Sequence, residues 1–119
     1  MVDEISTRDL RERVRSDDDV QVIDIREPHE VGPRVPGADH VPMSELTLEL
    51  GARDWDDEIY VICCHGNSSI QAVRLLESYE GVAEDATVAS VAGGYVEWDW
   101  EVEDDGTVVA EPTEVAAAC

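Results

Sequence analysis

The stretch Ile59-Tyr60-Val61-Ile62-Cys63-Cys64-His65-Gly66-Asn67-Ser68-Ser69 joins an apolar run to a group of small and polar residues. The run from Ile59 to Cys63 is rich in β-branched residues and has little polar alternation, which is typical of a strand covered on both faces. Glycine and hydrogen-bonding side chains then favour a loop. An apolar stripe at helical spacing over about residues 69–79 predicts a helix after that loop. The stretch therefore predicts a strand–loop–helix unit with Cys63 where the strand ends.

Predicted strands and helices alternate on both sides of this unit. We expect helices over residues 6–16, with Ser6 as a cap, and over residues 43–50 and 95–100. We expect strands over residues 20–25, 40–41 and 87–91, and a weak strand over residues 108–110. Glycines and prolines force a loop over residues 32–37. Strands that alternate with helices predict the α/β fold class, with a mostly parallel central sheet flanked by helices on both faces.

The size and charge of the chain limit its domain number and its partners. Its 119 residues suit one compact domain. We expect a single domain over residues 1–119, with a core at about residues 5–100 and a C-terminal tail at residues 101–119. The 8 cationic residues are all arginines, and 29 acidic residues bring the formal net charge to −21. Nucleic acids and anionic membranes bind proteins through positive charge, so we expect neither as a partner.

The composition also bears on where the protein works. We find no apolar run near the roughly 20 residues that span a bilayer and no signal-peptide pattern, so we expect a cytoplasmic protein. The acidity, with no Lys and no Phe, resembles the composition of halophilic archaeal proteins. Salt at about 1 M would screen the repulsion between these charges. An acidic interaction surface in an ordinary cell is the alternative interpretation.

The three cysteines are Cys63, Cys64 and Cys119. An odd number with two adjacent members is a poor disulfide framework, so we expect reduced thiols. Cys63, Cys64 and His65 are consecutive and cannot all turn toward one tetrahedral centre, which argues against a zinc site.

Cys63 is the candidate nucleophile. Ligands of parallel α/β sheets bind beyond the carboxyl ends of the strands, which is where Cys63 lies in the predicted fold. The loop after it can direct several backbone N–H groups at one point, and the positive end of the following helix would favour the thiolate form. The alternative is that Cys63 is a small buried apolar residue, as free cysteines commonly are.

Four segments of the chain resemble the rhodanese domain family. They are residues 23–26 with Glu30, residues 35–42 (Val-Pro-Gly-Ala-Asp-His-Val-Pro), the loop of residues 63–69, and residues 91–98 (Val-Ala-Gly-Gly-Tyr-Val-Glu-Trp). Together they cover about residues 5–100 in the order found in the family. The loop is similar to the Cys-Tyr-His-Gly-Asn-Ser-Ser loop of short single-domain thiosulfate sulfurtransferases, with Cys64 in the place of tyrosine.

The resemblance implies a sulfurtransferase that works through a persulfide on Cys63. A donor such as thiosulfate would supply the sulfur, and a thiol, cyanide or a sulfur-accepting protein would take it. A persulfide anion needs fixed hydrogen-bond donors rather than a proton shuttle, so we expect no metal and no organic cofactor.

The other candidate site residues have roles that are either functional or structural. His65 either adds positive charge for an anion or faces solvent. Gly66 supplies backbone conformation, and Asn67, Ser68 and Ser69 are expected to shape the loop or cap the helix rather than contact substrate. Arg26 either assists a donor sulfonate or, as we favour, forms an ion pair with Glu30. Cys64 either replaces tyrosine passively, which we favour, or acts as a second thiol. Gly93 and Gly94 are expected to form a turn close beneath the loop.

Two other functions compete with this interpretation. A cysteine-dependent phosphatase needs an arginine six residues after its nucleophile, and the residue there is Ser69. The second alternative is a rhodanese module that binds a partner or carries sulfur to it without turnover on thiosulfate. Thiocyanate formation at molar salt, compared between the native chain and Cys63→Ser, discriminates between the two rhodanese functions.

Overall fold

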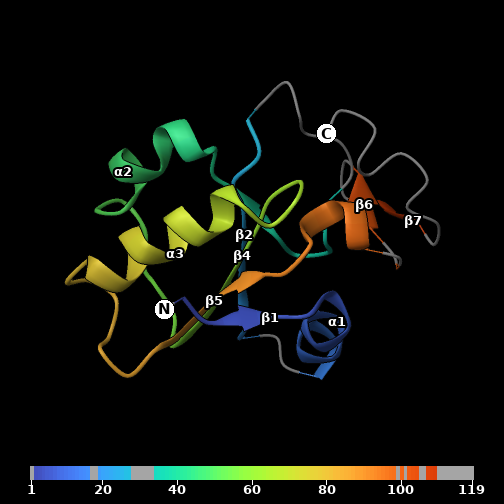
Figure 1. Ribbon diagram of the computed structural model, residues 1–119, viewed down its shortest axis with the longest axis horizontal. Coiled ribbons are helices and arrows are strands. Elements are labelled where there is room, and N and C mark those ends of the chain that lie inside the picture. Colours follow the sequence, from blue (N-terminus) through green and yellow to red (C-terminus); the bar gives the residue numbers. More distant parts are fainter. Residues whose placement is uncertain are drawn as a thin grey trace.

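The computed structural model describes residues 2–16, 19–27, 34–98, 100, 102–104 and 107–109. Five strands form one sheet in the order β1-β5-β4-β2-β3, and each neighbouring pair is parallel (Figure 1). The strands are β1 (Glu4–Ile5), β2 (Gln21–Asp24), β3 (Asp39–His40), β4 (Glu58–Ile62) and β5 (Thr87–Val91). The parallel sheet confirms the α/β class expected from the alternation of strands and helices.

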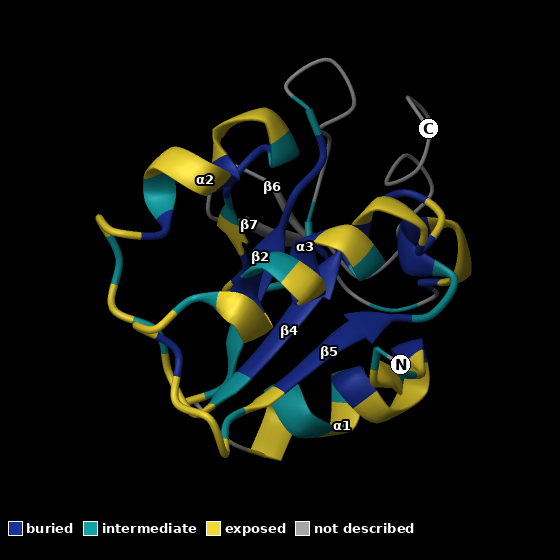
Figure 2. Ribbon diagram, turned by 60° about the vertical axis from the view of Figure 1, so that its left-hand side comes forward, coloured by how far each residue is buried: buried dark blue, intermediate teal, exposed yellow. Residues whose placement is uncertain are grey.

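Helices cover both faces of this sheet, as expected. They are α1 (Thr7–Ser16), α2 (Leu46–Glu49) and α3 (Ser68–Ser78), together with the 3₁₀ turns η2 (Met43–Glu45) and η3 (Gly94–Glu97). Leu46 and Leu76, from α2 and α3, belong to one buried apolar cluster. Leu10 of α1 and Tyr95 of η3 belong to a second cluster. Strands β4 and β5 are buried between these two layers (Figure 2). No helix in the described part of the chain has the length and apolar content needed to cross a bilayer.

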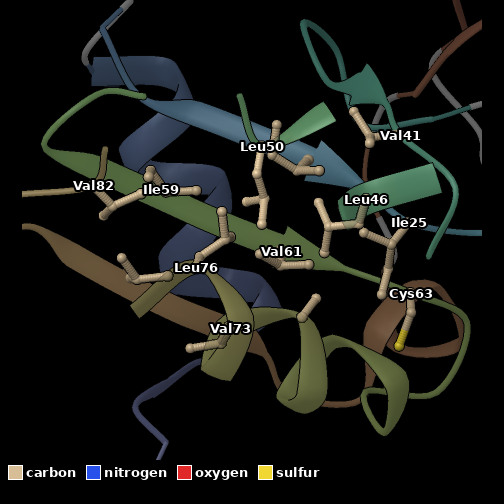
Figure 3. Packing of buried hydrophobic residues seen from close by; sticks show 13 residues of the cluster. Ile25, Val41, Leu46, Leu50, Ile59, Val61, Cys63, Val73, Leu76 and Val82 are labelled. Atoms are coloured by element: carbon tan, nitrogen blue, oxygen red, sulfur yellow. The ribbon is translucent and has the colours of Figure 1, made fainter. Parts of the chain in front are cut away.

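Side chains of β4 alternate between the two clusters, because successive residues of a strand point to opposite faces. Ile59 and Val61 pack in the cluster beneath α2 and α3, while Tyr60 and Ile62 pack in the other. Cys63 continues the row of Ile59 and Val61, and its sulfur lies at the end of that row near Ile25 (Figure 3). The position of Cys63 just after β4 confirms the strand–loop–helix prediction.

Several local predictions are confirmed and others are wrong. Ser6 caps α1, since its Oγ accepts a hydrogen bond from the Asp9 N–H at 3.1 Å. The helix expected over residues 95–100 is instead the short turn η3, which ends at Glu97. Strand β7 (Thr107–Val109) matches the expected weak strand, whose last residue lies outside the described residues. It pairs antiparallel with β6 (Val102–Asp104), which the sequence did not predict.

Candidate active site

Cys63 lies at the carboxyl edge of the sheet and lines a pocket of about 350 Å³. Strands β2 and β4 are parallel neighbours, and the Ile25 N–H donates to the Ile62 carbonyl at 3.1 Å just beyond them. The chain segments that follow the two strands therefore meet at one edge. The pocket is lined by Ile25, Arg26, Glu27, Met43, Cys63, Cys64, His65, Asn67 and Ser68.

The Cys63 thiol is buried but polar groups surround its sulfur. The side chain is free of any disulfide and the residue is 6% exposed. The Gly66 N–H donates to Sγ at 3.1 Å, and the Cys63 thiol donates to the Ser69 Oγ at 3.4 Å. The Ser69 Oγ lies in turn 2.6 Å from the Ser90 Oγ of β5. Cys63 thus contacts the Gly66 N–H donor and the Ser69 hydroxyl and lines a pocket, which is not the environment of a merely apolar cysteine.

The loop after Cys63 rests on the turn formed by Gly93 and Gly94, as expected. Gly66 has a φ of +87°, and a Cβ on it would lie 2.8 Å from the Gly93 nitrogen. The Tyr95 N–H donates to the Cys63 carbonyl at 2.9 Å, and the Val96 N–H donates to the Cys64 carbonyl at 3.1 Å. These contacts between backbones fix the height of the loop above the sheet.

His65, Asn67 and Ser68 are exposed and line the pocket. Asn67 occupies the position before α3, but its side chain makes no capping hydrogen bond. Ser69 is fully buried and its hydroxyl is directed to Cys63 and Ser90. Of the two roles expected for Ser69, shaping the loop or capping the helix, the cap is not formed, because its side chain points into the space between α3 and the sheet.

Arg26 lines the pocket, but its charge is matched by a neighbouring carboxylate. The side chains of Arg26 and Asp24 are both 0% exposed, and Nη2 lies 2.7 Å from Oδ2. The Arg26 Nε also lies 3.1 Å from both Asp24 carboxylate oxygens. The partner we expected, Glu30, lies outside the described residues. Among the described residues, the structure therefore shows Asp24 as an ion-pair partner of Arg26.

Tyr95 connects this ion pair to the loop. The centroid of its ring lies 3.8 Å from the Arg26 guanidinium carbon, and its hydroxyl donates to the Asp24 Oδ2 at 3.1 Å. The same hydroxyl accepts a hydrogen bond from the Val35 N–H at 3.1 Å. Burial, together with the Asp24 carboxylate, raises the pKa of Tyr95 far above its ordinary value, so the hydroxyl stays protonated and remains a donor.

Cys64 is buried and disulfide-bonded. The expectation that all three thiols are reduced is wrong for this residue, while Cys119 lies outside the described residues. A sulfur held in a disulfide is not a nucleophile, so a second-thiol role for Cys64 would first require its reduction.

The sequence did not indicate four residues that shape the site. Ser90, Tyr95, Glu27 and Met43 were not candidates, although Ser90 carried a signal as a hydroxyl residue within an apolar strand. Glu27 places a carboxylate on the pocket and accepts hydrogen bonds from the Ser44 N–H at 2.9 Å and its Oγ at 2.8 Å. The arrangement as a whole can stabilise a sulfur anion at Cys63 and admit a small reactant to it.

Comparisons with known proteins agree with this geometry. Residues 6–100 match the family described as "Rhodanese-like domain". The chain is 30% identical to "Putative sulfurtransferase YtwF" of Bacillus subtilis (strain 168) over 101 residues, which cover 84% of this chain and 93% of YtwF. It is 30% identical over 103 residues to "Putative sulfur carrier protein YrkF" of the same strain, covering 86% of this chain and 54% of YrkF.

A solved structure shows the same fold. "Human Single Domain Sulfurtranferase TSTD1" superposes with a TM-score of 0.67 at 26% identity, covering 82% of this chain and 96% of that chain. The strand order, the pocketed cysteine and the match over residues 6–100 lead to one conclusion. This chain belongs to the rhodanese-like domain family.

Proposed function

We propose that this chain transfers sulfane sulfur from a donor such as thiosulfate to a thiophilic acceptor through a persulfide on Cys63. The observation that supports this proposal most strongly is the position of the Cys63 sulfur. It lies against the Gly66 N–H at 3.1 Å and the Ser69 hydroxyl at 3.4 Å, while the residue itself lines the pocket. A fixed donor and an adjacent opening are what an anionic sulfur nucleophile requires.

The reaction has two displacement steps at sulfur. In the first, the Cys63 thiolate attacks the outer sulfur of thiosulfate, a new S–S bond forms, and sulfite leaves with the electron pair of the broken S–S bond. In the second, the acceptor attacks the outer sulfur of the persulfide, and the electron pair of that bond returns to Cys63 as a thiolate. With cyanide as acceptor the product is thiocyanate. Neither step needs an outside oxidant or reductant.

The loop residues have different places in this proposal. Gly66 donates to the sulfur and gives the loop its positive φ. The Ser69 hydroxyl, which accepts from the thiol, would donate to the sulfur once it is an anion. His65, Asn67 and Ser68 line the mouth that a donor or acceptor would enter. Arg26 helps to shape the pocket wall, and its pairing with Asp24 reduces the charge that it could offer a sulfonate.

Charge opposes a small anionic donor at low ionic strength. The chain carries a formal net charge of −21, and Glu27 adds a carboxylate to the pocket itself. At about 1 M salt the screening length falls to about 3 Å, which removes most of this repulsion. We therefore expect thiosulfate turnover to rise with ionic strength.

Thiocyanate formation from thiosulfate and cyanide in molar KCl tests the proposal. The native chain should turn over and Cys63→Ser should not, because serine cannot form a persulfide. Ser78→Ala is a matched control, since Ser78 is exposed and its hydroxyl bonds the Leu75 carbonyl far from the pocket. Equal thiocyanate production by the native chain and Cys63→Ser would refute catalysis at Cys63.

The second candidate function is sulfur carriage to a protein partner. The carboxylate of Glu27 at the pocket and the acidic chain favour it, and a relative is named a sulfur carrier protein. In that case Cys63 would still gain sulfur from the donor, but cyanide and small thiols would remove it slowly. Persulfide formation without thiocyanate turnover would select this function over the first.

A further inference from the structure

Ser90 is an unusual residue for its place in the fold. It lies in β5, where its register partners are Val61 of β4 and Glu4 of β1. The residue is fully buried. Serine is mostly exposed in folded proteins, and burying a hydroxyl costs about 1–3 kcal/mol unless it is hydrogen-bonded. A polar side chain at this position therefore needs a reason.

The hydroxyl of Ser90 reaches one side-chain group in the described part of the chain. Its Oγ lies 2.6 Å from the Ser69 Oγ, and either atom could be the donor. The Ser69 Oγ lies 3.4 Å from the Cys63 Sγ. All three side chains lie between α3 and the sheet, so they form a chain of two hydroxyls that ends on the reactive sulfur.

The protonation state of Cys63 decides which group donates in each of these two hydrogen bonds. A hydroxyl has one hydrogen to donate, and a thiolate can only accept. With Cys63 as the thiolate, Ser90 donates to Ser69 and Ser69 donates to Sγ, so every hydrogen is used. With Cys63 as a thiol that donates to Ser69, three hydrogens share two contacts, and either serine can donate to the other. One serine hydrogen is then left without an acceptor among the described residues.

We propose that Ser90 is a positioning residue that directs the Ser69 hydroxyl toward the Cys63 sulfur and so favours the anionic form of that sulfur. The inference rests on the proposed function in one respect, which is that Cys63 is the nucleophile. Ser90 itself touches neither Cys63 nor a substrate. Its effect passes through Ser69, which is why the sequence around the loop gave no indication of it.

The test is the pH profile of Cys63 alkylation by iodoacetamide, localised to Cys63 by fragment mass. The alkylation rate follows the thiolate fraction. Ser90→Ala removes the hydrogen bond between two neutral hydroxyls that holds Ser69, which is worth about fivefold in the equilibrium, so alkylation should be about fivefold slower below the midpoint. The high-pH plateau should be unchanged. Ser90→Thr, which keeps the hydroxyl, should restore the native profile.

A double-mutant comparison separates positioning from packing. In a Ser69→Ala background, Ser90→Ala should produce no further shift, since the group through which it acts is gone. The isosteric pair Ser90→Thr and Ser90→Val repeats the comparison at equal volume if Ser90→Ala does not fold. An unchanged profile in Ser90→Ala, an equal slowing at every pH, or a full effect in the Ser69→Ala background would each overturn the proposal.

The alkylation assay uses no sulfur donor, so its outcome is independent of sulfur transfer. If Ser90→Ala shifts the alkylation profile but the native chain transfers no sulfur, the proposed function is refuted and the role of Ser90 is supported. If the native chain transfers sulfur but Ser90→Ala leaves the alkylation profile unshifted, only the role of Ser90 is refuted.

Discussion

Replacing Gly94 with alanine would place a methyl group against the backbone of the active-site loop. A Cβ on Gly94 would overlap the Cys63 carbonyl oxygen and lie 2.8 Å from the carbonyl carbon and oxygen of Cys64. These are backbone atoms and cannot turn aside as a side chain could. Gly94 also has a φ of +60°, which disfavours any residue with a Cβ.

The loss of stability expected for Gly94→Ala follows from the overlap and from the left-handed backbone. The left-handed backbone costs an alanine about 1–2 kcal/mol. Relief of the overlap must part the loop from η3, which breaks the hydrogen bonds from Tyr95 to Cys63 and from Val96 to Cys64. Each is worth about 1 kcal/mol, so we expect Gly94→Ala to lower the free energy of unfolding by about 3–4 kcal/mol in total.

Gly37→Ala is the matched control. Gly37 has a φ of +81° but a Cβ there would meet nothing within 4 Å, so only the backbone cost of about 1–2 kcal/mol applies. Urea unfolding followed by tryptophan fluorescence measures both variants. A loop moved by 1 Å can lose about a hundredfold in rate, so alkylation of Cys63 should slow in Gly94→Ala and not in Gly37→Ala. Equal stability and equal alkylation in the two variants would refute the close approach of the turn to the loop.

Three further predictions concern charge. Asp24→Asn removes a carboxylate partner of the buried Arg26 and should cost about 3–5 kcal/mol of stability. Asp39→Asn removes the exposed carboxylate that lies 3.6 Å from Arg53 and should cost under about 1 kcal/mol. Similar urea midpoints for the two variants would contradict this difference. Two hydrogen bonds from Arg13 hold the pKa of Glu58 below its ordinary value of 4.5. The stability that this pairing contributes is therefore complete above that value and is lost as the pH falls through the lowered pKa. Glu58→Gln should therefore be less stable than the native chain at pH 7, with a gap that closes below about pH 4.5, and a gap of constant size would be evidence against this pairing. Because of the net charge of −21, the urea midpoint of the native chain should rise as KCl is raised toward about 1 M, and a flat response would contradict the repulsion and the high-salt interpretation.

The sequence predicted the elements whose evidence is local. The apolar run before Cys63 and the helical stripe after it are continuous signals, and they place the cysteine at a strand end without any knowledge of tertiary contacts. Strand β1 has two residues, Glu4 and Ile5, and a period cannot be recognised over two positions. The pairing of β1 with β5 depends on a contact between distant parts of the chain, which no local pattern contains.

The side-chain contacts of the site could not be predicted from the sequence for the same reason. The hydroxyls of Ser69 and Ser90 meet because α3 packs on the face of β5 to which Ser90 points. Arg26 was expected to pair with Glu30, which lies four residues further along and outside the described residues, whereas Asp24, the last residue of β2, lies two residues before Arg26. The Arg26 Nη2 donates to the Asp24 Oδ2 at 2.7 Å, a contact that the spacing to Glu30 did not indicate.

The mass of the intact protein after treatment with thiosulfate in molar KCl measures sulfur uptake at Cys63 directly. The native chain and Cys64→Ser should each gain the mass of one sulfur atom, which fragmentation places on Cys63. Cyanide should then remove that sulfur. Cys63→Ser should gain none. Sulfur retained by Cys63→Ser, or its absence from the native chain, would contradict a persulfide at Cys63.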